Sequence, residues 1–248
     1  MSASNFPLGT LVGITAYAGN YETRLILRKT LRHFRWRNGP DVPLLVVSDG
    51  PILDSEIYRY ADYVLCRPGP SGLQQGELEN LRLMVDFAHG RGYRYLVKSA
   101  GDVIMNRPEW IRTALEFLLS KGRRILSTHW FHNDSWVVGT KFFIAEVDFL
   151  RQVLPEKVTA ANLEVMLTES IRRHYPLEEI ASLINSNTGE AHEVEGELAE
   201  WQWEHAHRLY KFRHLDDETD PIERIGHRYF LYPALRLVRQ LHRSLKRD

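Results

Sequence analysis

Apolar and polar positions along the first half of the chain alternate between two periods. Short apolar runs rich in β-favouring residues predict buried strands at 10–17, 44–50, 61–67 and 93–101. Apolar residues at helical spacing predict helices between and after these strands, at 21–36, 53–60, 77–92 and 107–122. Strands that alternate with helices in this way are typical of a mostly parallel sheet covered by helices on both faces.

The second half of the chain has a different pattern. Residues 124–131 and 136–145 are expected to be strands joined by a turn at 132–135, and 146–154 and 160–175 to be helices. Thr159 or Asn162 would cap the second of these helices. Residues 182–220 are polar and irregular, which is typical of a lid or a loosely packed connection, and the chain ends in a basic amphipathic helix.

We therefore expect an α/β protein with a mostly parallel central sheet flanked by helices and a helical C-terminal extension. Residues 1–180 would form the main domain, and residues 181–248 would form a lid and the terminal helix. The terminal helix carries its basic residues opposite an apolar stripe. Such a helix can lie on an anionic membrane, or it can dock on the domain with its basic face in water.

Composition narrows the class of protein. With 248 residues, of which 44% are hydrophobic, the chain can bury a substantial core. The formal net charge is zero, so we expect no nucleic-acid partner. The single cysteine, Cys66, excludes an internal disulfide, and its apolar surroundings predict a buried thiol. No leader-like or membrane-spanning run is present, so we expect a cytoplasmic protein.

Candidate chemistry lies at the ends of the predicted strands. Tyr17, Asp49 and Asp102 each follow a different strand, and ligands of parallel sheets bind at the carboxyl ends of the strands. The three side chains are therefore expected at one edge of the sheet. Alternatives remain for two of them, because Asp49 in "SDGP" also suits a plain turn and Tyr17 also suits the core.

Four stretches in order resemble glycosyltransferases of the GT-A fold, of the inverting, family-2-like kind. They are "LVGITAYAGN", "LLVVSDGP", "GELENLRLMVDFAHGRGYRYLVKSAGD" and "VVGTKFFIAEVDFL", and the resemblance covers roughly residues 10–170. It implies a nucleoside-diphosphate sugar as donor, in the first place a uridine diphosphate sugar, and a glycan or a lipid-linked acceptor. A Mn²⁺ or Mg²⁺ ion would bridge a protein carboxylate and the diphosphate.

The resemblance also implies roles for residues on the donor side. It assigns nucleotide contacts to Tyr17, Asp49 and Asn80, although Asn80 also suits a solvent-facing helix position. Asp102 would bind the metal, with His192 from the C-terminal part as a second ligand.

The chain departs from the family at the DxD motif. This motif has become Ala100-Gly101-Asp102, so its first aspartate is missing. Lys98 lies two residues before it and would contact a phosphate or Asp102. A lysine that takes over part of the charge role of the metal is therefore an alternative to full metal dependence.

Inverting transfer also needs a carboxylate that deprotonates the acceptor hydroxyl. Glu164 in "ANLE", at the start of a helix, is the first candidate, and Asp134 in "HNDS" is the second. Glu164 is equally an ordinary first-turn glutamate favoured by the helix dipole. Trp130 and Trp136 flank the turn and could stack on an acceptor sugar or pack in the core.

Two other functions remain open. A nucleotidyltransferase would share the α/β sheet and the metal, but it would need a glycine-rich basic loop after the first strand, where "AYAGNYETR" has one glycine. A sugar- or nucleotide-binding protein without catalysis would agree with the missing aspartate of the DxD motif.

Overall fold

The computed structural model describes residues 9–17, 21–69, 73–101, 103–105, 110–132, 135–159, 162–176, 181–185 and 203–205. The chain divides into two compact units, residues 1–204 and 205–248. Apart from position 205, the second unit lies outside the described residues, and so does the expected terminal helix. The fold below is that of the first unit.

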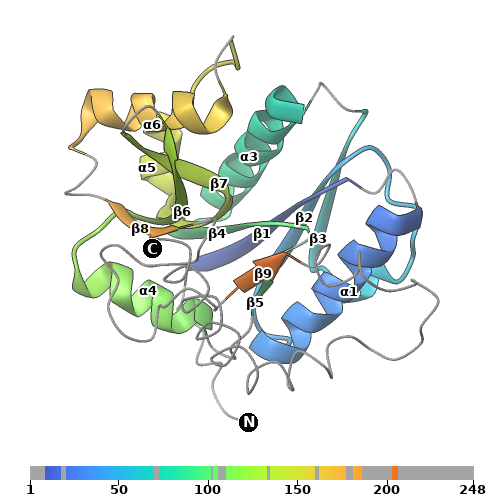
Figure 1. Cartoon of the computed structure of the whole chain (residues 1–248). Helices are drawn as coiled ribbons and strands as arrows, with labels where there is room; N and C mark the ends of the chain where they lie inside the picture. Colours follow the sequence, from blue (N-terminus) through green and yellow to red (C-terminus); the bar gives the residue numbers. More distant parts are fainter. Residues whose placement is uncertain are drawn as a thin grey trace, which may run out of the picture. The chain divides into compact units, whose positions relative to one another are not determined.

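Seven strands form one sheet in the order β3-β2-β1-β4-β7-β6-β8 (Figure 1). Their bounds are β1 Thr10–Ala16, β2 Leu44–Asp49, β3 Tyr63–Arg67, β4 Tyr95–Ala100, β6 Ile125–His132, β7 Ser135–Glu146 and β8 Ala181–Asn185. β1 runs parallel to β2 and β4, β2 to β3, and β6 to β8, whereas β7 is antiparallel to both β4 and β6. This confirms the mostly parallel sheet and the predicted hairpin. Two short strands, β5 (Val103–Met105) and β9 (Trp203–His205), form a separate pair.

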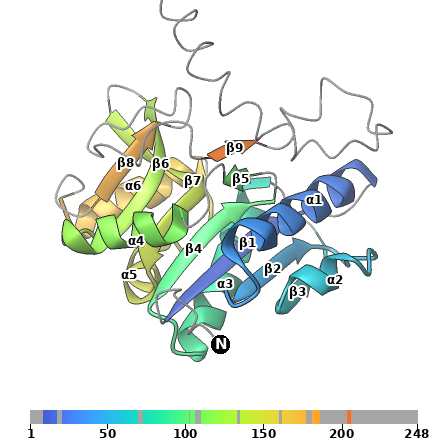
Figure 2. The ribbon, with the colours of Figure 1, turned by 90° about the horizontal axis from the view of Figure 1, so that it is seen from below.

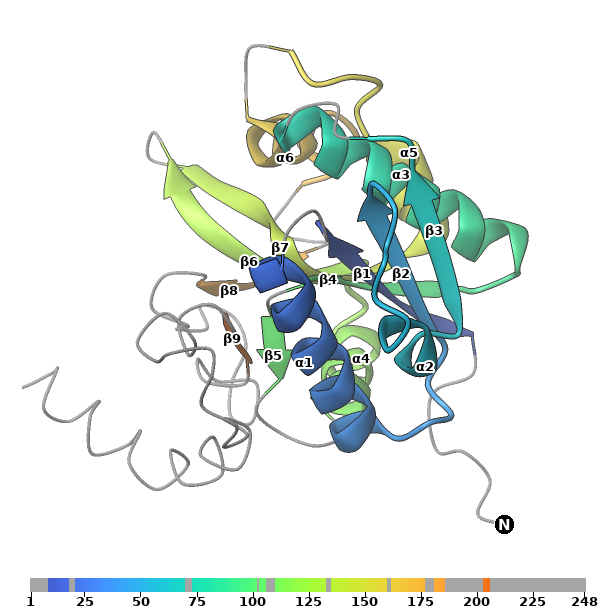
Figure 3. The same ribbon diagram turned by 90° about the vertical axis from the view of Figure 1, so that its right-hand side faces the viewer.

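Helices cover both faces of the sheet. Their bounds are α1 Tyr21–Asn38, α2 Ile57–Tyr60, α3 Leu73–Gly90, α4 Trp110–Ser120, α5 Val147–Val153 and α6 Leu163–His174. α1 and α4 lie on one face, and α3, α5 and α6 lie on the other (Figures 1 and 3). Figure 2, seen from the side of α1 and α4, shows both of these helices across the strands. The predicted α/β class with helices on both faces is confirmed.

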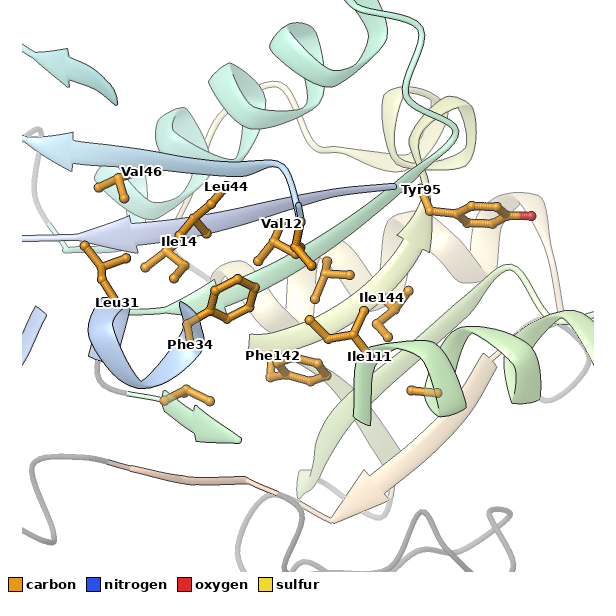
Figure 4. Packing of buried hydrophobic residues seen from close by; sticks show 14 of the residues in the cluster. Val12, Ile14, Leu31, Phe34, Leu44, Val46, Tyr95, Ile111, Phe142 and Ile144 are labelled. Carbon is orange, nitrogen blue, oxygen red and sulfur yellow. The ribbon is translucent and has the colours of Figure 1, made fainter. Parts of the chain in front are cut away.

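Successive side chains along each strand point to opposite faces of the sheet, so the protein has one hydrophobic core on each face. On β1, Val12 and Ile14 face α1 and α4, while Leu11 faces the α3 side. Figure 4 shows Val12 and Ile14 beside Leu31 and Phe34 of α1. The apolar residues that lie near helical spacing on this helix are all buried: Leu25, Leu27, Leu31 and Phe34. Burial of this stripe stabilises α1, because most of the stability of a helix in a protein comes from packing of its apolar face.

One burial prediction is wrong. Cys66 is exposed, not buried. It lies on β3, at one end of the sheet, and within the described part of the chain β3 has a neighbouring strand on one side only. Its apolar sequence neighbours therefore do not translate into burial on both faces of the strand.

Two element bounds also differ from expectation. α3 begins at Leu73, four residues before the start predicted at residue 77. β8 lies in the segment expected to be irregular and pairs with β6 from Ile125–Ala181 to His129–Asn185. It begins just past the expected domain boundary at residue 180, which stays a prediction.

Candidate functional site

The order of strands reverses between β1 and β4. The chain proceeds from β1 outward to β2 and β3 and then returns to place β4 on the other side of β1. The carboxyl ends of two strands that diverge in this way open a crevice, which is where open α/β sheets bind ligands. Tyr17 follows β1 directly at this point and is 53% exposed. The alternative of a core position for Tyr17 is therefore excluded, and its contact with a nucleotide stays a prediction.

The small residues at the end of β4 are required by the backbone of β1. A Cβ atom at Gly101 would lie 3.0 Å from the carbonyl oxygen of Thr15 and 3.6 Å from Cα of Ala16. A side chain at this position would force the backbone of β1 to move, so glycine suits the close contact between the end of β4 and the end of β1. Asp102 is the next residue, but it lies outside the described residues, as do Asp134 and His192.

Asp49 ends β2 because the following residue turns the chain. Gly50 has a φ of 92°, a conformation that favours glycine. The Asp49 Oδ1 atom accepts a hydrogen bond of 2.6 Å from Nη1 of Arg67, which is the residue paired with Asp49 in the parallel register. The carboxylate is thus held at the carboxyl edge of the sheet by the last residue of β3.

Arg67 is the centre of a buried polar cluster and is 8% exposed. Besides Asp49, its guanidinium donates to the Gly76 carbonyl (3.1 Å), to Oδ1 of Asn80 (3.3 Å) and to the Glu79 carboxylate. Asn80 is 2% exposed, which excludes the solvent-facing position considered for it. Two of the predicted nucleotide residues, Asp49 and Asn80, therefore meet through an arginine that the sequence reasoning missed.

Lys98 forms the second cluster. It follows Leu96 on the face of β4 covered by α3, and it is 1% exposed. Its ammonium group donates to the Glu77 carboxylate of α3 and to the carbonyl oxygen of Thr140 on β7. Both contacts are to protein, so its expected contact with a phosphate or with Asp102 stays a prediction.

Glu164 is hydrogen-bonded to Thr140 of β7, whose carbonyl oxygen also accepts from Lys98. Its Oε1 atom accepts hydrogen bonds from the Thr140 backbone N–H (2.7 Å) and from Oγ1 of Thr140 (3.2 Å). Asn162 is the residue that caps α6, since its side chain accepts from the Glu164 N–H at 2.8 Å. The first candidate base therefore lies at a capped helix N-terminus, at the same edge of the sheet as the Lys98 cluster.

The first turns of α3 connect both clusters to α6. Gln74 accepts from the Leu163 N–H and Gln75 from the Val158 N–H, each at 3.0 Å. The same turns supply Gly76, Glu77, Glu79 and Asn80 to the two clusters. Because α3 reaches β2, β3, β4 and α6 from one segment, this helix end fixes the geometry of the whole edge.

Among the described residues, the Arg67 and Lys98 clusters together with Glu164 contain four carboxylates and two cations. The carboxylates are Asp49, Glu77, Glu79 and Glu164, and the cations are Arg67 and Lys98. Within the described part of the chain, no group of three His, Cys, Asp or Glu side chains is placed to hold a metal ion.

The remaining predictions concern the acceptor side and the membrane. The backbones of Trp130 and Trp136 lie in the β6–β7 hairpin, where Trp130 pairs with Val137 and Trp136 pairs with Phe131. Among the helices that the structure describes, none has both the length and the apolar run needed to cross a bilayer.

No known family model matches the chain, and no curated protein matches its sequence. Solved structures do resemble it. A putative nucleotide-diphospho-sugar transferase from Desulfovibrio desulfuricans G20 is 14% identical with a TM-score of 0.49, over 71% of this chain and 80% of that chain. A cytidylyltransferase from Leptospira borgpetersenii is 12% identical with a TM-score of 0.49, over 74% of this chain and 78% of the other.

A third similar structure is glucosyl-3-phosphoglycerate synthase from Mycobacterium tuberculosis, in complex with Mn²⁺, uridine diphosphate and phosphoglyceric acid. It is 16% identical with a TM-score of 0.48, over 71% of this chain and 68% of that chain. At such values these likenesses assign neither a family nor an activity to this chain.

Proposed function

We propose that the protein transfers a sugar from a nucleoside-diphosphate sugar, in the first place a uridine diphosphate sugar, to a glycan or a lipid-linked acceptor. The observation that carries the proposal is the reversal of strand order between β1 and β4, where open α/β sheets bind ligands. There the exposed Tyr17, the close approach at Gly101 and the carboxylate of Asp49 come from three adjacent strands. The family resemblance in the sequence supplies the donor class.

On the donor side, Tyr17 stacks on the nucleobase and Asp49 accepts a hydrogen bond from its N–H edge. A carboxylate suits this role because hydrogen bonds to charged groups are stronger than neutral ones. Asn80 acts through Arg67, which holds both side chains in place.

The diphosphate would lie next to Asp102, which directly follows the close approach of Gly101 to the end of β1. Asp102, with His192, would hold a Mn²⁺ or Mg²⁺ ion, for which a carboxylate oxygen is a suitable ligand. When bound, such an ion supplies charge stabilisation for the leaving nucleoside diphosphate.

On the acceptor side, Glu164 deprotonates the attacking hydroxyl, and Asp134 is the alternative base. The hydrogen bonds from Thr140 orient the Glu164 carboxylate without removing it from the edge of the sheet. Trp130 and Trp136 pack on the acceptor sugar, and the basic terminal helix would bring the protein to a membrane that holds a lipid-linked acceptor.

Product analysis tests the proposal. The protein is incubated with a panel of nucleotide sugars and acceptors, with and without Mn²⁺, and release of nucleoside diphosphate is measured. In a second arm it receives nucleoside triphosphates and sugar 1-phosphates, and release of pyrophosphate is measured. Sugar transfer predicts the first product, and pyrophosphate alone would establish a nucleotidyltransferase instead.

Binding measurements separate catalysis from simple recognition. Thermal stabilisation by a nucleoside diphosphate, without turnover in either arm, would identify a non-catalytic binding protein. Asp102→Asn is expected to abolish the Mn²⁺-dependent part of nucleotide binding with an unchanged fold, and an unchanged affinity would remove Asp102 from the metal site.

A further inference from the structure

A buried lysine next to the candidate base requires a physical reason. Removing an ammonium group from water is costly unless a counter-charge and hydrogen bonds replace the solvent. Lys98 has both, from the Glu77 carboxylate and the Thr140 carbonyl. Neither contact is needed to fill the core, where Leu96 on the same face of β4 packs without any polar group.

The reason lies in an irregularity of β7. The β6–β7 register shifts between Ser127 and His129, so residues 139–142 lie between the paired residues Val138 and Phe143. On the other side of β7, the described pairing with β4 ends at Phe142. Thr140 lies in this interval and is buried. Buried backbone groups must be paired. Its N–H donates to Glu164 and its carbonyl accepts from Lys98.

The backbone carbonyl of the preceding residue, Gly139, is also paired with a side chain. Its oxygen accepts a hydrogen bond of 2.9 Å from the Ser127 hydroxyl. The irregular part of β7 is therefore held by side chains from β4, β6 and α6. Such irregularities re-aim groups beside functional sites.

We propose that Lys98 is a positioning residue for Glu164 and acts through Thr140. The ammonium group fixes the Thr140 carbonyl, and this fixes the N–H and the hydroxyl of the same residue against Oε1 of Glu164. Glu77 neutralises the ammonium, so the first turns of α3 on the donor side are part of the arrangement. The inference rests on the proposed function, because it assumes that Glu164 is the base.

The test removes the ion pair as a unit. Lys98→Met with Glu77→Gln leaves no unpaired buried charge. A carboxylate displaced by about 1 Å predicts a fall in kcat of about 10²-fold. The dissociation constant of the nucleotide donor is expected to stay within about twofold of the wild-type value, because no donor contact has been removed.

A double-mutant cycle distinguishes positioning from a structural role. If Lys98 acts through Glu164, adding the Lys98/Glu77 change to Glu164→Gln lowers kcat little further, since the two act as a unit. Effects that multiply would overturn the inference. So would a weaker donor affinity at unchanged kcat, which would make Lys98 a donor ligand.

One further variant probes the Thr140 side chain directly. Thr140→Val removes the hydroxyl but keeps the backbone N–H and the side-chain shape, and it is expected to lower kcat by roughly threefold to tenfold at constant donor affinity. An unchanged kcat for Thr140→Val also counts against the inference.

The matched control is Arg35→Met with Asp62→Asn, which removes an ion pair of 2.7 Å beside the first residue of β2, at the other edge of the sheet. It is expected to lower the melting temperature and leave kcat unchanged. A wild-type protein that transfers no sugar at all would overturn the proposed function, and this inference with it.

Discussion

Adding a single methyl group to α3, at Gly76, is expected to weaken nucleotide binding while the protein remains folded. In Gly76→Ala, the new Cβ would lie 3.0 Å from Oδ2 of Asp49 and 3.5 Å from Nη1 of Arg67. Asp49 cannot simply rotate away, because its Oδ1 atom is bound to the same guanidinium at 2.6 Å. The carboxylate must therefore shift by a few tenths of an ångström, and the ion pair must shift with it.

Two terms of opposite sign determine the stability of this variant. Alanine in place of glycine stabilises a helix interior by about 1 kcal/mol. Crowding in a packed site costs about 1–3 kcal/mol. The free energy of unfolding of Gly76→Ala should therefore fall by no more than about 2 kcal/mol, and the protein should remain folded.

The gain in helix stability from alanine does not offset the effect of the substitution on nucleotide affinity. If Asp49 accepts a hydrogen bond from the nucleobase, displacement of the Asp49 carboxylate loses much of a contact worth about 1.5–3 kcal/mol. This loss predicts a dissociation constant for uridine diphosphate that is higher by about tenfold or more.

Titration calorimetry with uridine diphosphate and urea unfolding are run on the same samples. Gly90→Ala is the control, because it adds a methyl group to the same helix with no atom within 4 Å of the new Cβ. It should bind as the wild type does. If folded Gly76→Ala binds as tightly as Gly90→Ala, Asp49 does not contact the nucleotide.

Three further predictions concern the base and the backbone. Glu164→Gln should lower transfer by about 10²-fold or more with donor affinity retained, measured by steady-state kinetics; if Asp134→Asn has this effect instead, the base is Asp134. Gly101→Ala should lower the free energy of unfolding in urea by about 1–3 kcal/mol, because its Cβ meets the backbone of β1. Thr168→Val should cost about 1–3 kcal/mol in the same assay, since the buried Val138 N–H loses its acceptor at 2.8 Å, and an unchanged midpoint would contradict this.

The layers of the fold could be predicted because they depend on local periodicity. The stripe on α1 and the hairpin of β6 and β7 are both visible as patterns of apolar residues. β8 was missed because five residues in a polar segment gain their order from pairing with β6, a contact more than fifty positions away. The early start of α3 was missed for a related reason, since Gln74 and Gln75 are bonded to distant backbone groups.

The edge of the sheet could be predicted only in part. Asp49 was found because strand ends of a parallel sheet meet at one edge. Its partner Arg67 requires the register of β2 and β3, which sequence spacing alone does not supply. The burial of Lys98 likewise depends on Glu77 and on the irregular part of β7, neither of which has a signature in the sequence.

The structure of the protein with bound uridine diphosphate tests the central claim most directly. We expect the uracil ring of the nucleotide to lie beside Tyr17 and Asp49 at the reversal between β1 and β4, and the diphosphate to lie next to Asp102. A nucleotide bound anywhere else on the protein, or no binding at millimolar concentration, would contradict the account.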